Sequence, residues 1–240
     1  FASLAGAQTA PFNGPRQVDP RWHAITHATL VPSPGKVIED ATIVVRDGVI
    51  VSVAAGGAPP EGARVWDYTG LTVYPGLIDA HVAVDAPKPD DGAPGTHWNS
   101  VVTPQRSALD GDGLGERDRK ALRDLGFAAG VISPKGGVFR GQGALVLFTE
   151  PRDDVSADPT TVVLPRVYHS VAMETARWGQ GVYPSSQMGA IAVIRQTLMD
   201  AAWYADATEA WRRNPGANEA PERNDALAAL GRNGRDSMPV

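Results

Sequence analysis

The chain has 240 residues, of which 42% are hydrophobic and 20% are charged, proportions typical of a folded, water-soluble protein and not of a disordered one. Its formal net charge is −5, which argues against a nucleic-acid-binding protein, and no basic stripe with interleaved aromatic residues occurs. No apolar run reaches the roughly 18 residues that a membrane span needs, and the absence of cysteine excludes disulfides and thiolate metal sites.

Residues 1–21 contain several prolines and little periodicity, so we expect an extended lead-in. Within it, the small residues from Leu4 to Gln8 resemble the end of a secretory signal with an Ala-x-Ala cleavage site. A flexible linker is the alternative, because a basic start and most of an apolar segment are missing. The export interpretation predicts a periplasmic or secreted protein.

Residues 22–73 read as short strands separated by turns. We expect strands at 25–31, 41–46, 49–53 and 63–68. Asp47-Gly48 stands between two Val/Ile-rich runs, and this dipeptide favours a type I′ hairpin, which needs positive φ at both central residues. The segment is therefore predicted to be a small, locally paired β unit.

Residues 74–240 alternate between strand and helix patterns, with strands expected at 77–82, 127–132, 144–148, 160–164 and 167–172. Helices are expected at 116–125, 185–212 and 222–230, and loops at 86–115 and 134–143. In the longest helix the apolar spacing predicts a packing face of Met188, Ile191, Ile194, Leu198, Ala201 and Ala202, joined by Trp203 and Trp211. This part is shorter than the roughly 250 residues of a (β/α)8 barrel. We expect part of such a barrel within a longer polypeptide; a smaller fold is the alternative.

Two stretches resemble the amidohydrolase superfamily: DATIVVRDGVIVSV over Asp40–Val53, and GLTVYPGLIDAH over Gly70–His81. This superfamily includes imidazolonepropionases and dihydroorotases. The resemblance to it is strong over residues 24–81. It implies a split, urease-like β-sandwich followed by a metal-bearing TIM-like (β/α)8 barrel, an α/β fold class. It also implies a His-x-His pair on the first barrel strand, binding one or two divalent metals such as zinc.

The second histidine of that pair is replaced by Ala83. Residues i and i+2 of a strand share a face, so a His-x-His pair places both imidazoles together, and here only His81 remains. Catalytic zinc usually has three protein ligands, so the motif is degenerate. Asp85 and His169 are candidate substitute ligands, and a relic histidine without metal is the alternative for His81. No catalytic residue is assigned.

The glycine-rich loop 134–143 carries Lys135 and Arg140, which could hold an anion together with backbone N–H groups. A tight connection between two strands is the alternative. For the whole protein, the resemblance implies a metal-dependent hydrolase of non-peptide carbon–nitrogen bonds. This segment would be a catalytically degenerate part of it, not active alone.

The alternative is a non-catalytic scaffold or interaction domain, in effect a pseudoenzyme. Expected partners are a small-molecule substrate and the rest of the barrel, or a second amidohydrolase-like domain or chain. For either function, a homo-oligomer is a further candidate partner, and neither nucleic acid nor a membrane span is expected.

Overall fold

The computed structural model describes residues 21–149, 160–175 and 183–231, so the export segment predicted near the N-terminus lies outside the described residues. The chain divides into two compact units, Phe1–Pro75 and Gly76–Val240, close to the predicted end of the β unit at Val73. None of the helices in the described ranges is both long and apolar enough to cross a membrane.

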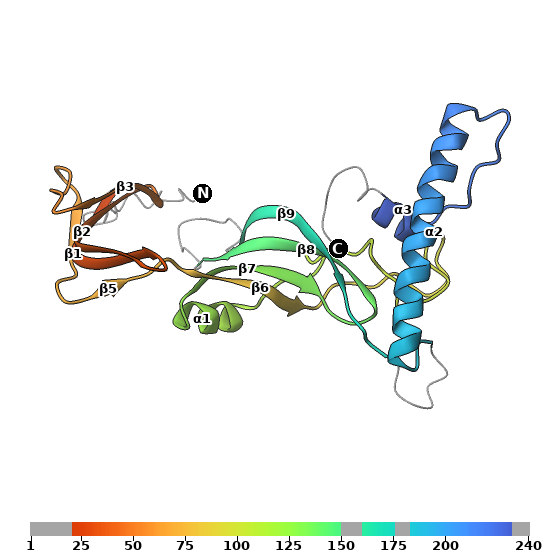
Figure 1. Cartoon of the computed structure of the whole chain (residues 1–240), viewed down its shortest axis with the longest axis horizontal. Coiled ribbons are helices and arrows are strands. Elements are labelled where there is room, and N and C mark those ends of the chain that lie inside the picture. The colour runs from red at the N-terminus through yellow and green to blue at the C-terminus, as the bar shows by residue number, and fades with distance from the viewer. Residues whose placement is uncertain (1–20, 150–159, 176–182, 232–240) are drawn as a thin grey trace, which may run out of the picture. The chain divides into compact units, whose positions relative to one another are not determined.

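The first unit is a sheet with the strand order β3-β2-β1-β4, in which β5 also pairs with β1 (Figure 1). Its strands are β1 (Trp22–Ser33), β2 (Lys36–Arg46), β3 (Val49–Ala55), β4 (Arg64–Asp67) and β5 (Thr72–Val73). Asp47 and Gly48 join β2 to β3 with φ of 50° and 82°, the positive values that a type I′ turn requires. The predicted hairpin is confirmed. Leu30, Ala41 and Ile43 form the core of this unit.

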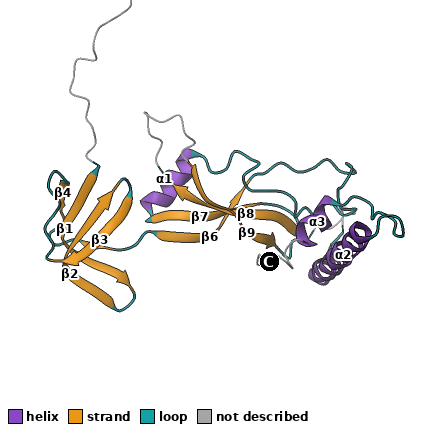
Figure 2. Cartoon of the chain, turned by 90° about the horizontal axis from the view of Figure 1, so that it is seen from above, coloured by secondary structure: helices purple, strands orange, loops and turns teal. Residues whose placement is uncertain are grey.

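The second unit is built on a four-stranded sheet with the order β6-β7-β8-β9 (Figure 2). These strands are β6 (Leu77–Val84), β7 (Phe127–Pro134), β8 (Phe139–Phe148) and β9 (Thr160–Val171). β6 and β7 are parallel, and α1 (Glu116–Asp124) lies between them in the chain, so they form a β/α/β unit. Gly126 follows α1 with φ of 90°, which confirms the predicted end of that helix.

Beyond β7 the sheet continues with antiparallel strands. Only residues 135–138 join β7 to β8, and a parallel crossover needs a dozen or more residues. A second antiparallel step then makes β9 run in the same direction as β6 and β7. Three of the four strands therefore end at the same edge of the sheet.

Two predictions for these strands were wrong in detail. The predicted loop 134–143 is a strand from Phe139 onward, because Phe139 is fully buried and β8 pairs along this stretch with β9. Position 141 of this strand suits glycine because the backbone of Arg106 passes close to it. A Cβ at Gly141 would lie 2.6 Å from the Arg106 carbonyl oxygen. The strands predicted on either side of Pro165 are one strand, β9, with irregular register near that proline.

The helix α2 (Gln187–Arg213) begins as predicted, with the Ser186 hydroxyl accepting a hydrogen bond from the Gly189 N–H at 3.1 Å. Its predicted packing face was right only in part: Ala201 is buried and Ile194 packs against the core, but the other predicted members are half-buried or exposed. The residues that are buried are Ala190, Val193, Thr197 and Ala201, whereas Met188 is 75% exposed and Trp203 64% exposed. Small side chains face inward because α3 (Asp225–Gly231) packs closely: a Cβ at Gly231 would lie 3.2 Å from that of Ala205.

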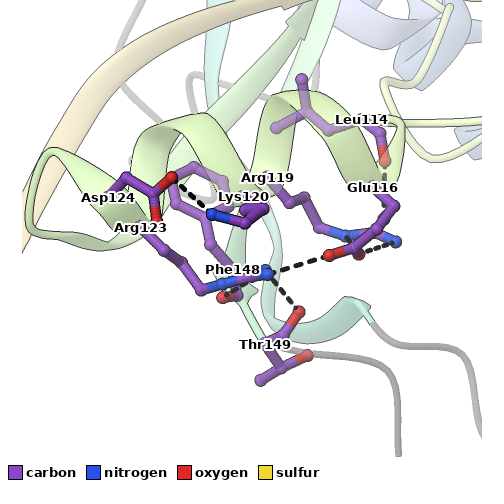
Figure 3. Close-up of polar contacts among 8 residues, drawn as sticks. All are labelled: Leu114, Glu116, Arg119, Lys120, Arg123, Asp124, Phe148 and Thr149. Atoms are coloured by element: carbon purple, nitrogen blue, oxygen red, sulfur yellow. Dashed lines mark hydrogen bonds and ion pairs between the residues drawn. The ribbon is translucent and has the colours of Figure 1, made fainter.

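Polar contacts fasten α1 to the sheet (Figure 3). The Glu116 carboxylate accepts hydrogen bonds from Arg119 at 3.1 and 3.2 Å and from Arg123 at 2.8 Å. Arg123 also donates to the Phe148 carbonyl oxygen at 3.4 Å and to that of Thr149 at 3.0 Å, at the end of β8. These bonds to the two guanidinium groups hold the pKa of Glu116 below its ordinary value of 4.5.

One face of this sheet is covered by apolar packing. Val84, Ile132 and Val146 form its centre, and Leu122 of α1 packs against them. At the other end of the unit, α2 and α3 pack on the start of β8 and on the loop around Val102. This arrangement leaves the carboxyl edge of β6, β7 and β9 bordered by the loops that follow them.

Candidate functional site

The carboxyl edge of the second sheet is where ligands bind in open α/β sheets and in (β/α)8 barrels, because the loops there are free to carry polar groups. Here Asp85 follows β6, Lys135 follows β7 and Glu174 comes shortly after β9. His81, the residue singled out from the sequence, lies inside β6 just before this edge.

His81 lies in a β-bulge. In the pairing of β6 with β7, Asp79 is opposite Gly130 and Val82 is opposite Ile132, so β6 has one extra residue between them. The Asp79 carboxylate accepts a hydrogen bond from the His81 backbone N–H at 3.0 Å, which stabilises the bulge. Bulges of this kind redirect a side chain, and the His81 side chain is exposed.

The His81 ring contacts Tyr168 of β9. Nδ1 lies 2.9 Å from the phenolic oxygen, which itself donates its single proton to the Ala80 carbonyl oxygen at 3.1 Å. Nδ1 therefore donates to the phenolic oxygen, and Nε2 carries the ring lone pair. A histidine held in this tautomer can offer Nε2 to a ligand.

Tyr168 was not found from the sequence, because only the strand order brings it near His81. It pairs with Gly143 on β8, and a Cβ at Gly143 would lie 3.2 Å from the tyrosine ring, so glycine makes room for the ring. Burial raises the pKa of Tyr168, and the charge of Asp79 raises it further. The phenol therefore stays protonated and remains a donor at neutral pH.

The predicted ligands His81, Asp85 and His169 are not brought together. The Asp85 carboxylate forms an ion pair with Nζ of Lys135 at 2.7 Å and is 86% exposed. His169 is 1% exposed and follows Tyr168 directly in β9, so it points to the opposite face of the sheet from the tyrosine. The three ligand assignments stay predictions.

The described residues do not supply enough ligands for a catalytic metal. Within residues 21–149, 160–175 and 183–231, no group of three or more His, Asp or Glu side chains is gathered that could hold an ion. Catalytic zinc usually takes three protein ligands, and His81 supplies one.

The predicted anion-binding cations are both paired with carboxylates. Lys135 bonds to Asp85 as above, and Arg140 donates to Glu174 at 3.0 Å. The Gly137 N–H also donates to Glu174, at 3.1 Å. The groups that could cradle an anion in this loop are thus engaged by the protein's own acidic side chains. Their role in anion binding stays a prediction.

Arg106 organises the loops at this edge, and sequence reasoning missed it. It is 4% exposed and donates only to backbone carbonyl oxygens, with distances of 2.6 Å to Ala86, 2.9 Å to Pro87 and 3.2 Å to both Lys135 and Arg140. One guanidinium thereby ties the segment after β6 to the connection between β7 and β8. Burial lowers the pKa of Arg106 from its ordinary value, which is too high for the group to lose its charge at neutral pH.

A cavity of about 510 Å³ opens beside these loops. Its lining includes Lys88, Asp91, His97, Trp98, Gln105 and Glu174. Nδ1 of His97 accepts a hydrogen bond from the Asn99 backbone N–H at 3.1 Å, and burial lowers the pKa of His97, so the imidazole is neutral near pH 7. His81 does not line this cavity.

Part of the chain is similar in sequence to enzymes of known function. A dihydroorotase from Citrifermentans bemidjiense is 35% identical over 80 residues, which is 33% of this chain and 17% of that enzyme. An imidazolonepropionase from Deinococcus radiodurans is 47% identical over 45 residues, 19% of this chain and 11% of that enzyme. No family model matches.

A crystal structure of an amidohydrolase from Thermotoga maritima MSB8 has the same fold. It superposes with a TM-score of 0.66 at 22% identity and covers 90% of this chain and 56% of that one. The chain is related to the amidohydrolase superfamily. The predicted resemblance is confirmed, and so is the predicted fold class, a small β-sandwich unit followed by part of a (β/α)8-like barrel.

The relationship to this superfamily is limited in extent. The chain spans less than a fifth of the curated relatives it matches, and about half of the Thermotoga amidohydrolase. The superfamily likeness implies a divalent metal, but the described residues bring one imidazole, that of His81, to the expected strand.

Proposed function

We propose that the whole protein is an amidohydrolase-superfamily hydrolase that cleaves carbon–nitrogen bonds other than peptide bonds. The supporting observation is the sequence match to a dihydroorotase and an imidazolonepropionase, joined to the amidohydrolase fold of the chain. In this proposal the present segment supplies the opening strand of the barrel with a degenerate metal motif and does not catalyse the reaction alone.

Two features support the degeneracy. Ala83 stands where a second imidazole would be needed, and its methyl group cannot replace a nitrogen donor. Nδ1 of His81 is bonded to Tyr168, so the ring has at most Nε2 to offer. The further donors would come from the rest of the barrel, or from a second amidohydrolase-like domain or chain. A divalent metal bound there would supply Lewis-acid activation of water.

The alternative is a non-catalytic scaffold or interaction domain. The exposed apolar side of α2 favours it, because Met188, Met199 and Trp203 are 75%, 58% and 64% exposed. Such a surface is typical of a contact with another protein element. The same surface is expected if the helix packs against other parts of a barrel, so activity is needed to separate the two functions.

We also propose that the protein is exported to the periplasm or secreted. The proposal rests on the small-residue stretch from Leu4 to Gln8. Fractionation of cells that express the native gene tests it, and recovery of the protein only with cytoplasmic markers would contradict it.

A hydrolysis assay tests the functional proposal. The native polypeptide and the 240-residue chain are each incubated with Zn²⁺ or Mn²⁺ and with dihydroorotate or imidazolonepropionate. We expect turnover by the native polypeptide and none above the blank by the chain alone. Turnover by the chain that disappears in His81→Ala would refute the degeneracy, and inactivity of the native polypeptide on a broad panel of cyclic amides would favour the scaffold.

A further inference from the structure

The helix α2 is apolar on two opposite sides. One side is buried, and α3 packs against it (Figure 1). The other side is exposed to solvent and contains Met188, Ile191, Leu198, Met199, Ala202 and Trp203. At 3.6 residues per turn the two sets of side chains point in opposite directions. A helix with apolar residues on both sides is normally covered on both, so the exposed side is a surface on which another element docks.

Two charged side chains of opposite sign lie within this apolar stripe. Arg195 and Asp206 are both exposed, and neither forms an ion pair with another of the described residues. About three helical turns separate them, so they point the same way as the apolar side chains between them. The partner that covers the stripe must therefore offer one charge of each sign, in the reverse order along its length.

A second copy of the same helix meets this requirement when it runs antiparallel. Arg195 and Asp206 are equally far in sequence from the midpoint between residues 200 and 201. A two-fold axis at that midpoint places Arg195 of each copy opposite Asp206 of the other, because a two-fold interface uses the same surface on both copies. Two ion pairs form across such an interface.

The same register also matches the apolar side chains in size. Leu198 of one copy lies level with Trp203 of the other. Met199 lies level with Ala202, so a long side chain faces a small one and the helices can approach closely. The charges and the volumes of the stripe are thus complementary in one arrangement.

We propose that the exposed side of α2 is a homodimerisation surface, on which the α2 helices of two chains pair antiparallel. The apolar side chains supply the attraction and the ion pairs between Arg195 and Asp206 fix the register. The paired stripe from Met188 to Asp206 is about 27 Å long. One helix from each copy buries less than the roughly 800 Å² per partner of a standard interface, so we expect a dissociation constant of about 10–100 µM. The dimer does not involve His81, and it stands whether or not the protein is a hydrolase.

Other occupants match the stripe less well. A lipid surface is bound by helices with an excess of cations beside the apolar side, whereas the two charges within this stripe cancel. A partner of one charge sign would attract Arg195 or Asp206 and repel the other. A further part of the barrel could cover the apolar side chains, and the native polypeptide separates this arrangement from a second copy.

Sedimentation velocity of the 240-residue chain, between about 1 and 200 µM, tests the proposal. We expect monomer at the lowest concentration and mainly dimer at the highest. Arg195→Asp and Asp206→Arg each place two like-charged contacts in the two-fold dimer, so each should weaken association about tenfold or more. An equimolar mixture of the two variants should recover association close to that of the wild type, because each negative stripe then faces a positive one.

Matched charge reversals on α1 serve as controls. Arg117→Asp and Asp118→Arg, at exposed positions, should leave association unchanged, and circular dichroism checks the folding of all four variants. A chain that stays monomeric at about 200 µM would overturn the proposal. So would a dimer that neither reversal in α2 weakens, or a mixture that associates no better than its components.

The same measurement on the native polypeptide identifies what covers α2 there. We expect it to associate as well, and Arg195→Asp should weaken this association. A native polypeptide that stays monomeric, or whose association Arg195→Asp leaves unchanged, would show that a second copy of α2 does not cover the stripe and would overturn the proposal.

Discussion

Nδ1 of His81 lies 2.9 Å from the phenolic oxygen of Tyr168, although 87 residues separate them in the chain. The strand order β6-β7-β8-β9 places them three strands apart, roughly 14 Å in a flat sheet, so the sheet must curve for the two side chains to meet. The contact thus reports both the curvature expected of a barrel segment and the tautomer of the one histidine left in the motif.

Tyr168→Phe should release the His81 ring. We expect the share of the Nδ1–H tautomer to fall, because its acceptor is gone, and the free energy of unfolding to drop by about 1 kcal/mol. Long-range ¹H–¹⁵N correlation spectra of the imidazoles measure the tautomer. Tyr74→Phe, at an exposed position in the first unit, is the control; an unchanged His81 spectrum in Tyr168→Phe would show that the bond does not set the tautomer.

Replacement of Arg106 should loosen the loops at the carboxyl edge. Arg106→Met removes the donor of four part-buried backbone carbonyls, so we expect the free energy of unfolding to fall by about 3 kcal/mol. Arg106→Lys should not restore it, since an ammonium group cannot span these acceptors. Chemical denaturation measures both, with the exposed Arg117→Met as control; a loss below about 0.5 kcal/mol would contradict this role.

The Glu116 cluster predicts a pH dependence. Because the folded-state pKa of Glu116 lies below its ordinary value of 4.5, its ionised form stabilises the fold above that pH, and the stabilisation is lost as the pH falls through the lowered pKa. Glu116→Gln should therefore lower the melting temperature at pH 7 more than at pH 3. A difference between the two proteins that stays constant from pH 7 to pH 3 would show that the charge of Glu116 is not involved.

The two sides of α2 should differ in their sensitivity to substitution. Ala201 is 3% exposed and packs near α3, so Ala201→Leu should cost about 1–3 kcal/mol through overpacking. Met199→Gln, at an exposed position of the same helix, should change stability by less than about 0.5 kcal/mol in this chain. Thermal denaturation compares them, and equal losses would mean that Met199 is packed as closely as Ala201.

Local signals in the sequence were sufficient for turns and helix ends. Asp47-Gly48, Gly126 and Ser186 each act within a few residues of themselves: the first forms the predicted turn, and the helices end before Gly126 and begin after Ser186, close to their predicted bounds. The family likeness, which rests on short motifs near His81, was likewise readable from the chain and is confirmed by the relatives.

Features that depend on contacts between residues far apart in the sequence could not be predicted from such local signals. The start of β8 at Phe139 follows from pairing with β9, and the inward face of α2 follows from the close approach of Gly231. The contacts of Tyr168 and Arg106 link strands and loops far apart in sequence, and a single tyrosine or arginine gives no signal of such a role. The site residues found only in the structure are all of this kind.

Zinc content tests the central claim most directly, namely that this chain offers an ion a single imidazole on its opening barrel strand. The purified chain is incubated with excess Zn²⁺, passed through gel filtration and analysed by mass spectrometry of the metal, beside His81→Ala. The account predicts less than about 0.1 equivalent of zinc in both. About one equivalent in the wild-type chain, lost in His81→Ala, would contradict it.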